Sequence, residues 1–281
     1  MFETTNANQE TIKKSEVKKP FEDLGLDLEK EYPKIAERLN ELHEQKDSHF
    51  QDALEMAKII DKLWDKLEIQ DVSKEKMILA ALLHDIGKSG PANASKQERK
   101  IIQTIFSKDL SLKKELEKPM KELSLRELVE NTEHEIENEE IEKYLKNDLQ
   151  LPIESWKAID FWQLHASWTY DILKKNSDGK IDEELINIAS SHHILDGINP
   201  AGLNEDEITH GSRTLEMIDK YYSLVLIDKY QAFRERSHKT HQEAIELLIE
   251  MVEKSAHGEE SRKHYINLIE KMADSKDILD K

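Results

Sequence analysis

The chain has 281 residues and a formal net charge of −18, with 36% charged and 37% hydrophobic residues. The negative charge excludes a groove for long nucleic acids, which require clustered Lys and Arg. No cysteine is present, which excludes disulfides, thiolate catalysis and zinc sites built from cysteine. No apolar run approaches the roughly 20 residues that span a bilayer, and the N-terminus lacks the apolar stretch of a signal peptide. We therefore expect a cytoplasmic protein without a membrane partner.

Low glycine and proline content indicates long elements and few turns. The chain has eight glycines and six prolines, and the period-two alternation typical of strands is hard to find. The sequence therefore predicts an all-α fold. Residues 1–20 are polar and Lys-rich, as in a disordered leader, and residues 21–281 read as a single helical domain.

The first strong helical pattern covers residues 50–67, where apolar residues recur at three- and four-residue steps. Ser48 is suited to cap this helix at its N-terminus, which places His49 in the first turn. The pattern predicts an amphipathic helix whose first turn carries an imidazole.

The most hydrophobic segment covers residues 77–83 and is apolar nearly all round. Such a helix is buried in the centre of a bundle. His84 and Asp85 follow directly, and Gly87 is expected to end the helix. The sequence therefore predicts that an imidazole and a carboxylate are delivered into the protein interior.

A charged segment interrupts this pattern between residues 91 and about 152, with an acidic run at residues 130–142. We expect an inserted helical subdomain or lid, whose acidic surface is a candidate contact for a protein partner. Further helices are then predicted. They cover residues 156–172, 185–189, the stretch around Asp228, 244–252 and 266–272.

Seven side chains of metal-ligand type lie on the inward sides or at the ends of these helices. They are His49, His84, Asp85, His165, His192, His193 and Asp228. Neutral imidazoles and carboxylates bind divalent metals, and a buried carboxylate is costly without a matching cation. Seven groups are too many for one ordinary ion. The pattern therefore indicates a dinuclear site inside a helical bundle.

Three segments, HDIGK, SHHILDG and LIDKYQAF, together resemble the HD-GYP branch of the HD metallohydrolases. In that family an early His precedes an HD-x-GK motif, a further His, a paired-His segment with Asp-Gly, and a final Asp followed by Tyr. The resemblance spans residues 49 to about 248 in the same order. It implies an HD-domain helical bundle with a helical insertion after the HD motif.

The resemblance also implies roles for individual residues. One metal would be held by His49, His84, Asp85 and Asp228, and the other by Asp85, His165, His192 and His193. A hydroxide shared between the metals would attack phosphorus. Asp85 and Lys88 would be the catalytic residues, and the substrate phosphate would contact Lys88, Arg236 and Lys239. The resemblance favours iron or manganese, while imidazole-rich sites also accept zinc or nickel.

The sequence departs from the HD-GYP pattern at several positions. Asp196 and Gly197 are followed by residues 198–202 without a Gly-Tyr-Pro, and Ile194 replaces the Glu that normally follows the paired histidines. Gln45 stands where some members carry a Glu for a third metal, so we expect two metals.

These observations favour a metal-dependent phosphodiesterase that hydrolyses a cyclic dinucleotide, similar to cyclic di-GMP, or a related nucleotide phosphodiester. One alternative is an HD-type diiron oxygenase, which uses nearly the same ligand order. The paired His193 and the following Asp196 and Gly197 favour the hydrolase. The other alternative is an inactive module that binds metal or nucleotide and signals through its insert.

Overall fold

The computed structural model describes residues 16–44, 49–69, 72–107, 112–113, 118–203, 219–235, 237–254 and 259–280. Within these ranges the chain is helical and contains no strand. Two isolated β-bridges join Leu112 to Thr132 and Ser124 to Lys157. The predicted all-α fold is confirmed.

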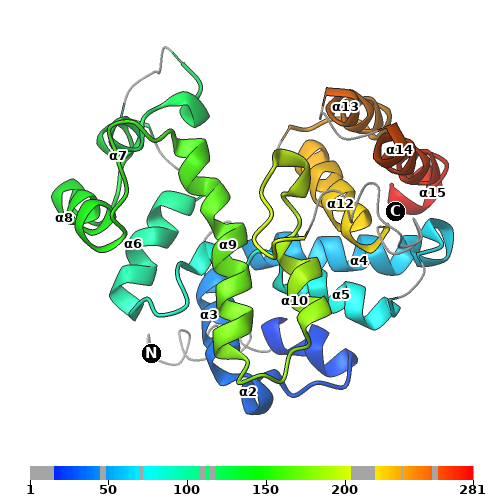
Figure 1. Ribbon diagram of the computed structural model, residues 1–281, viewed down its shortest axis with the longest axis horizontal. Helices are drawn as coiled ribbons and strands as arrows, with labels where there is room; N and C mark the ends of the chain where they lie inside the picture. The colour runs from blue at the N-terminus through cyan, green and yellow to red at the C-terminus, as the bar shows by residue number, and fades with distance from the viewer. Residues whose placement is uncertain are drawn as a thin grey trace, which may run out of the picture.

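The helices follow the chain order shown in Figure 1. The first half contains α2 (Leu28–Glu31), α3 (Pro33–Glu44), α4 (His49–Leu67), α5 (Lys74–Leu83), η1 (Ile86–Ser89), α6 (Lys96–Phe106), η2 (Met120–Glu122), α7 (Leu125–Asn131), α8 (Asn138–Lys143) and η3 (Tyr144–Asp148). The second half contains α9 (Ala158–Asn176), α10 (Glu183–Ser190), η4 (Ile194–Asp196), α12 (Asp219–Glu235), α13 (His241–Lys254), α14 (Glu259–Ala273) and α15 (Lys276–Leu279).

Helix α5 lies in the centre of the main hydrophobic core, as its uniformly apolar sequence predicts. It packs against α4, α10 and α12. The hydroxyl oxygen of Ser73 accepts a hydrogen bond from the backbone N–H of Lys76 and caps its first turn. Five of its side chains are buried, namely Met77, Ala80, Ala81, Leu82 and Leu83. The burial of α5 fixes where its C-terminal end enters the interior.

The predicted disordered leader, residues 1–20, extends too far into the chain. Residues 16–23 are helical, and Val17 and Phe21 are both buried in the main core. These two apolar residues are four apart and lie on one helical face, among lysines that make the segment look uniformly polar. Residues 1–15 lie outside the described residues.

The segment after the HD motif has an apolar core of its own. Helices α6, α7 and α8 and the π-helical turn η3 contribute buried side chains to a second hydrophobic cluster, in which Ile102, Leu128 and Ile141 are fully enclosed. Helix α9 belongs to both cores. Phe161 near its beginning packs in the second cluster, and Ile172 near its end packs in the main one. His165 therefore lies where the two cores meet.

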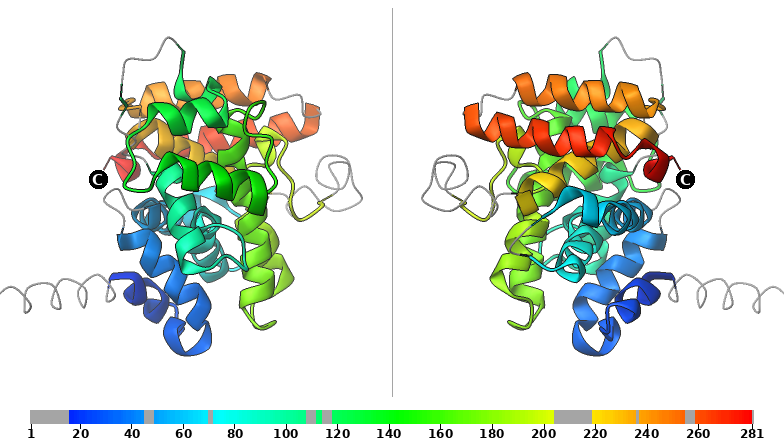
Figure 2. Two further views of the ribbon diagram at one scale, coloured as in Figure 1. Left: turned by 90° about the vertical axis from the view of Figure 1, so that its left-hand side faces the viewer. Right: turned by 90° about the vertical axis from the view of Figure 1, so that its right-hand side faces the viewer.

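The insert helices and the C-terminal helices α12–α14 lie on opposite sides of α9 and α10 (Figure 1). The two side views of Figure 2 place α7, α13 and α14 near one end of the molecule and α2 near the other. Among the described residues, no helix combines the length and apolar character that crossing a membrane requires.

Candidate metal centre

The HD motif follows the buried end of α5. His84 is the C-cap of α5 with helical backbone angles, and Asp85 precedes the short 3-10 helix η1. Both side chains are buried, with 1% and 4% exposure. The apolar sequence of α5 therefore delivers an imidazole and a carboxylate into the interior, as expected.

Gly87 does not end α5, contrary to expectation, because the helix already ends at Leu83. Its role is a close approach between η1 and α9. A methyl group at Gly87 would lie 1.9 Å from the carbonyl oxygen of His165. The backbone N–H of Gly87 donates to the hydroxyl of Thr169 at 3.0 Å, and that hydroxyl donates to the carbonyl of His84 at 2.7 Å. Because Gly87 has no side chain, the HD motif can pack directly against the backbone of α9.

Three histidines each form the same kind of orienting hydrogen bond, in which Nδ1 contacts the backbone carbonyl of the residue three positions earlier. The pairs are His84 with Ala81 at 2.7 Å, His165 with Trp162 at 2.5 Å and His192 with Ala189 at 2.8 Å. A carbonyl only accepts, so Nδ1 carries the proton in each ring. In the neutral form, each ring therefore presents the lone pair of Nε2, as metal-binding histidines commonly do.

Burial keeps two of these imidazoles neutral. It lowers the pKa of His165 to about 4, although nearby Asp85 favours the charged form. Burial also holds the pKa of His192 well below its ordinary value, and the neighbouring histidines reinforce the effect. Both rings therefore offer unprotonated Nε2 atoms near neutral pH.

These unprotonated nitrogens converge on one another. Nε2 of His165 lies 2.8 Å from Nε2 of His192 and 3.1 Å from Oδ1 of Asp85. Nε2 of His84 is buried without a hydrogen-bond partner, 3.4 Å from Oδ2 of Asp85. Converging lone pairs repel unless a cation lies among them. The arrangement therefore fits divalent metal ions.

Asp85 lies between two groups of side chains. Its Oδ1 faces His165 and His192, at 3.1 and 3.8 Å from their Nε2 atoms. Its Oδ2 faces His84 and forms a short contact with the ammonium of Lys88. Burial opposes ionisation of Asp85, but His84, Lys88 and His165 outweigh burial and hold its pKa well below the usual range. Asp85 is therefore a carboxylate whose two oxygens point in different directions.

His193 completes a cluster of three histidines with His165 and His192, in which one ligand atom of each lies within 4.8 Å of the others. Its Nδ1 lies 2.6 Å from Oδ2 of Asp196, and the same oxygen accepts a hydrogen bond from Lys229 at 2.8 Å. The carboxylate of Asp196 therefore orients His193. Sequence reasoning missed Lys229, although it follows Asp228 directly.

A second cluster joins His49, Asp52 and Asp85, again with one ligand atom of each within 4.8 Å of the others. Nε2 of His49 donates to the carbonyl oxygen of Phe106 at 2.9 Å, and Nδ1 lies 3.3 Å from Nζ of Lys88. Asp52 was not identified from the sequence. Its position one helical turn after His49 was the available signal. Ser48, the predicted cap, lies outside the described residues.

Asp228 lies at the edge of the same centre. Its Oδ1 is 4.0 Å from Nε2 of His84. Burial works against the charged form of Asp228, but Lys229 and His84 outweigh it and lower the pKa. The structure therefore brings Asp228 towards His84 as an ionised carboxylate.

Of the two further residues predicted to bind phosphate, only Lys239 belongs to the part of the chain that the structure describes. Arg236 lies outside the described residues. Lys239 follows the C-terminal end of α12, where its backbone N–H donates to Phe233. In the described part of the chain, its side chain has no contact with the histidine cluster. Lys88, by contrast, is buried within the centre.

Arg38 holds the segment that follows Lys88, and the sequence did not indicate this role. Its buried guanidinium donates to the hydroxyl of Ser89 at 2.9 Å and to three backbone carbonyls. The carbonyls belong to Gly90 at 3.0 Å, Pro91 at 2.8 Å and Ala92 at 2.9 Å. Four acceptors on consecutive residues fix the course of the chain beyond Lys88.

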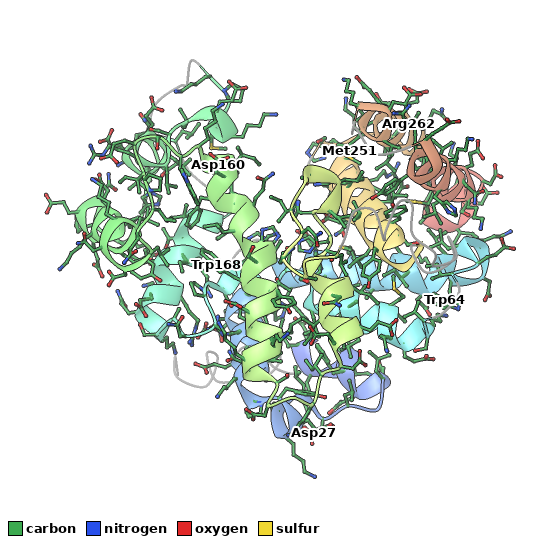
Figure 3. The ribbon with its side chains drawn as sticks, in the orientation of Figure 1. Asp27, Trp64, Asp160, Trp168, Met251 and Arg262 are labelled. Carbon is green, nitrogen blue, oxygen red and sulfur yellow. The ribbon has the colours of Figure 1, made fainter. Side chains whose placement is uncertain are left out.

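Helix α9 connects the centre to the insert. The ring of Phe106 at the end of α6 packs against His165 and Trp168. Trp168 lies on the side of α9 that faces α6 (Figure 3). The indole of Trp162 donates to the carbonyl of Ile105 at 3.2 Å. The insert therefore forms one wall of the centre.

Comparison with known protein families shows a match over part of the chain. Residues 50–155 match the family model of the HD domain, while no curated protein and no solved structure matches the chain. The matched range contains His84 and Asp85, and His165, His192 and Asp228 lie beyond it. Residues 50–155 are therefore similar to the HD domain, and together with the His and Asp clusters this similarity supports membership of the HD superfamily.

Proposed function

We propose that this chain is a metal-dependent phosphodiesterase of the HD-GYP type that acts on a cyclic dinucleotide or a related nucleotide phosphodiester. The observation that carries the proposal is the position of Asp85. Its two carboxylate oxygens face two different groups of metal-ligand-type side chains, the arrangement expected of a residue that bridges two metal ions.

The residues divide between two metal positions. His165, His192 and His193 would hold one ion, and His49, His84 and Asp228 would hold the other, with Asp85 shared. Two divalent ions, for which iron and manganese are our first choices, would activate water and neutralise charge on the phosphoryl oxygens. The low pKa of His165 and of His192 supports this assignment, since only a neutral imidazole binds metal.

Lys88 is the group we assign to the substrate phosphate. Its ammonium is buried beside Asp85 and His49, and its backbone is held by the Arg38 contacts to the next residues. A buried cation stabilises negative charge more strongly than an exposed one. Lys88 would therefore stabilise the charge that develops on phosphorus-bound oxygen in the transition state.

The paired histidines support a hydrolase over the oxygenase alternative. Both His192 and His193 belong to the same cluster, whereas the HD-type oxygenases generally use a single histidine at this place. Gly197 adopts a left-handed conformation with φ of 78° directly after Asp196. The Asp-Gly turn therefore forms in this chain without the Gly-Tyr-Pro sequence.

Hydrolysis by the full chain tests the proposal. The purified protein is stripped with a chelator, reloaded with manganese or iron, and incubated with bis(p-nitrophenyl) phosphate and a panel of cyclic dinucleotides. We expect hydrolysis by the wild type and none by Asp85→Ala, while the exposed Asp65→Ala on α4 behaves as wild type. Undiminished hydrolysis by Asp85→Ala contradicts the proposal. Oxygen consumption without hydrolysis supports the oxygenase instead.

A further inference from the structure

The two sides of Asp85 differ in chemistry. The side facing Oδ1 consists of imidazoles, those of His165, His192 and His193. The other cluster contains two carboxylates and one imidazole, from Asp52, Asp85 and His49. The aspartate at position 52 belongs to none of the motifs by which the sequence resembles the HD-GYP proteins.

Asp52 is placed by the first turn of α4. It lies three residues after His49, so the two side chains leave the helix on the same face. Both are buried, with 7% and 3% exposure.

The hydrogen bond between His49 and Phe106 decides which ring nitrogen of His49 can bind a metal. Its Nε2 donates to the carbonyl of Phe106, so in the neutral ring the lone pair resides on Nδ1. That atom lies 3.3 Å from the ammonium of Lys88, which also contacts Asp85. The ammonium of Lys88 therefore lies between His49 and Asp85, and these two groups already stabilise one positive charge.

An independent observation also points to a ligand at this side of Asp85. His84 is 1% exposed, and its Nε2 has no hydrogen-bond partner. It lies 3.4 Å from Oδ2 of Asp85, the oxygen that Lys88 contacts. A buried unpartnered nitrogen is costly, and a metal ion beside Asp85 would satisfy it.

We propose that Asp52 is a metal ligand together with His49 and Asp85, and that the two positions prefer different metals. Carboxylate-rich sites favour hard ions such as Mn²⁺, whereas imidazole-rich sites favour Zn²⁺ or Fe²⁺. The Asp52 side therefore accepts Mn²⁺ more readily than the three-histidine side does, and the three-histidine side prefers Fe²⁺ or Zn²⁺. This inference rests on the proposed two-metal function and adds a ligand and a metal preference to it.

Metal loading of the full chain tests the inference without measuring activity. Stripped protein is incubated with one equivalent of Zn²⁺ and an excess of Mn²⁺, desalted, and examined by elemental analysis and by the electron paramagnetic resonance signal of bound Mn²⁺. The wild type should retain one zinc and one manganese per chain. Asp52→Asn should keep zinc and lose manganese affinity by more than the roughly 10- to 100-fold typical of losing an outer-shell partner.

The exposed Asp65→Asn on the same helix is the matched control and should load as wild type. Asp52→Ser is measured alongside, and circular dichroism identifies which Asp52 variant is folded. Unchanged manganese affinity in a folded Asp52 variant overturns the role of Asp52. Random occupation of both wild-type positions by the two metals overturns the preference. A wild type that binds no metal at all overturns the proposed function itself.

Discussion

The Nε2 atoms of His165 and His192 lie 2.8 Å apart, although each ring has its Nδ1 in a hydrogen bond to a backbone carbonyl. In two neutral imidazoles arranged in this way, the lone pairs of the two Nε2 atoms face and repel each other. A cation between or beside them removes that repulsion. The pair therefore links stability of the fold to metal binding.

Metal binding should raise thermal stability. A ligand that binds only the folded state at 100 times its dissociation constant stabilises by about 2.7 kcal/mol. We expect the melting temperature to rise when stripped protein is reloaded with Zn²⁺ or Mn²⁺ and to fall again after chelation. Thermal scans measure this. His192→Ala should show a smaller rise, and a rise equal to that of wild type would remove His192 from the metal site.

The metal-free protein should lose stability in mild acid. His165 has a folded pKa of about 4, below the ordinary value of about 6.5. The unfolded chain therefore binds more protons between these values, and the free energy of unfolding decreases as the pH falls from about 6.5 to 4. Urea unfolding at a series of pH values measures this decrease. The decrease in the free energy of unfolding should be smaller in His165→Gln. A decrease as large as that of the wild type would mean that groups other than His165 cause it.

Gly87→Ala should strongly destabilise the fold, because the added methyl group would lie 1.9 Å from the carbonyl oxygen of His165. Overpacking against rigid backbone of this kind should cost at least about 3 kcal/mol. Gly179→Ala is the control. A methyl group at Gly179 would meet no neighbouring atom, so only the left-handed φ of 74° opposes the substitution, which should cost about 1 kcal/mol. Chemical denaturation compares them, and equal costs would contradict the close approach.

Lys88→Met should reduce phosphodiester hydrolysis while leaving both metals bound. The variant keeps an aliphatic stem of similar length but removes the ammonium beside Asp85. A loss of about 100-fold or more in kcat is expected for removing a group that stabilises transition-state charge. Steady-state kinetics with parallel elemental analysis measures this. The exposed Lys62→Met serves as control, and an active Lys88→Met would exclude Lys88 from the reaction.

Much of the fold was predictable because the apolar pattern of the central helices is strong. The uniform apolar run at residues 77–83 predicted burial, and the chain after it carries His84 and Asp85 into the interior. The structure also brings His165, His192 and His193 together from α9 and the end of α10. The ligand assignment of these residues stays a prediction until metals are measured.

The residues that sequence reasoning missed act through three-dimensional contacts. Arg38 binds backbone carbonyls, and carbonyls leave no trace in side-chain sequence. Lys229 reaches Asp196, which is far away along the chain. The sequence of the insert shows chiefly its charge, because its core residues, such as Leu128 and Ile141, are spread over short helices among many charged residues. Such partners become visible only once the helices are packed.

The most direct test of the account is the number of metal ions per chain in wild-type protein and in Asp85→Asn. The variant keeps the shape of the side chain but removes the charge that both ligand groups share. We predict two divalent ions in the wild type and loss of both from Asp85→Asn, measured by elemental analysis of folded, desalted protein. A wild type without metal, or a variant that keeps both ions, would contradict a centre bridged by Asp85.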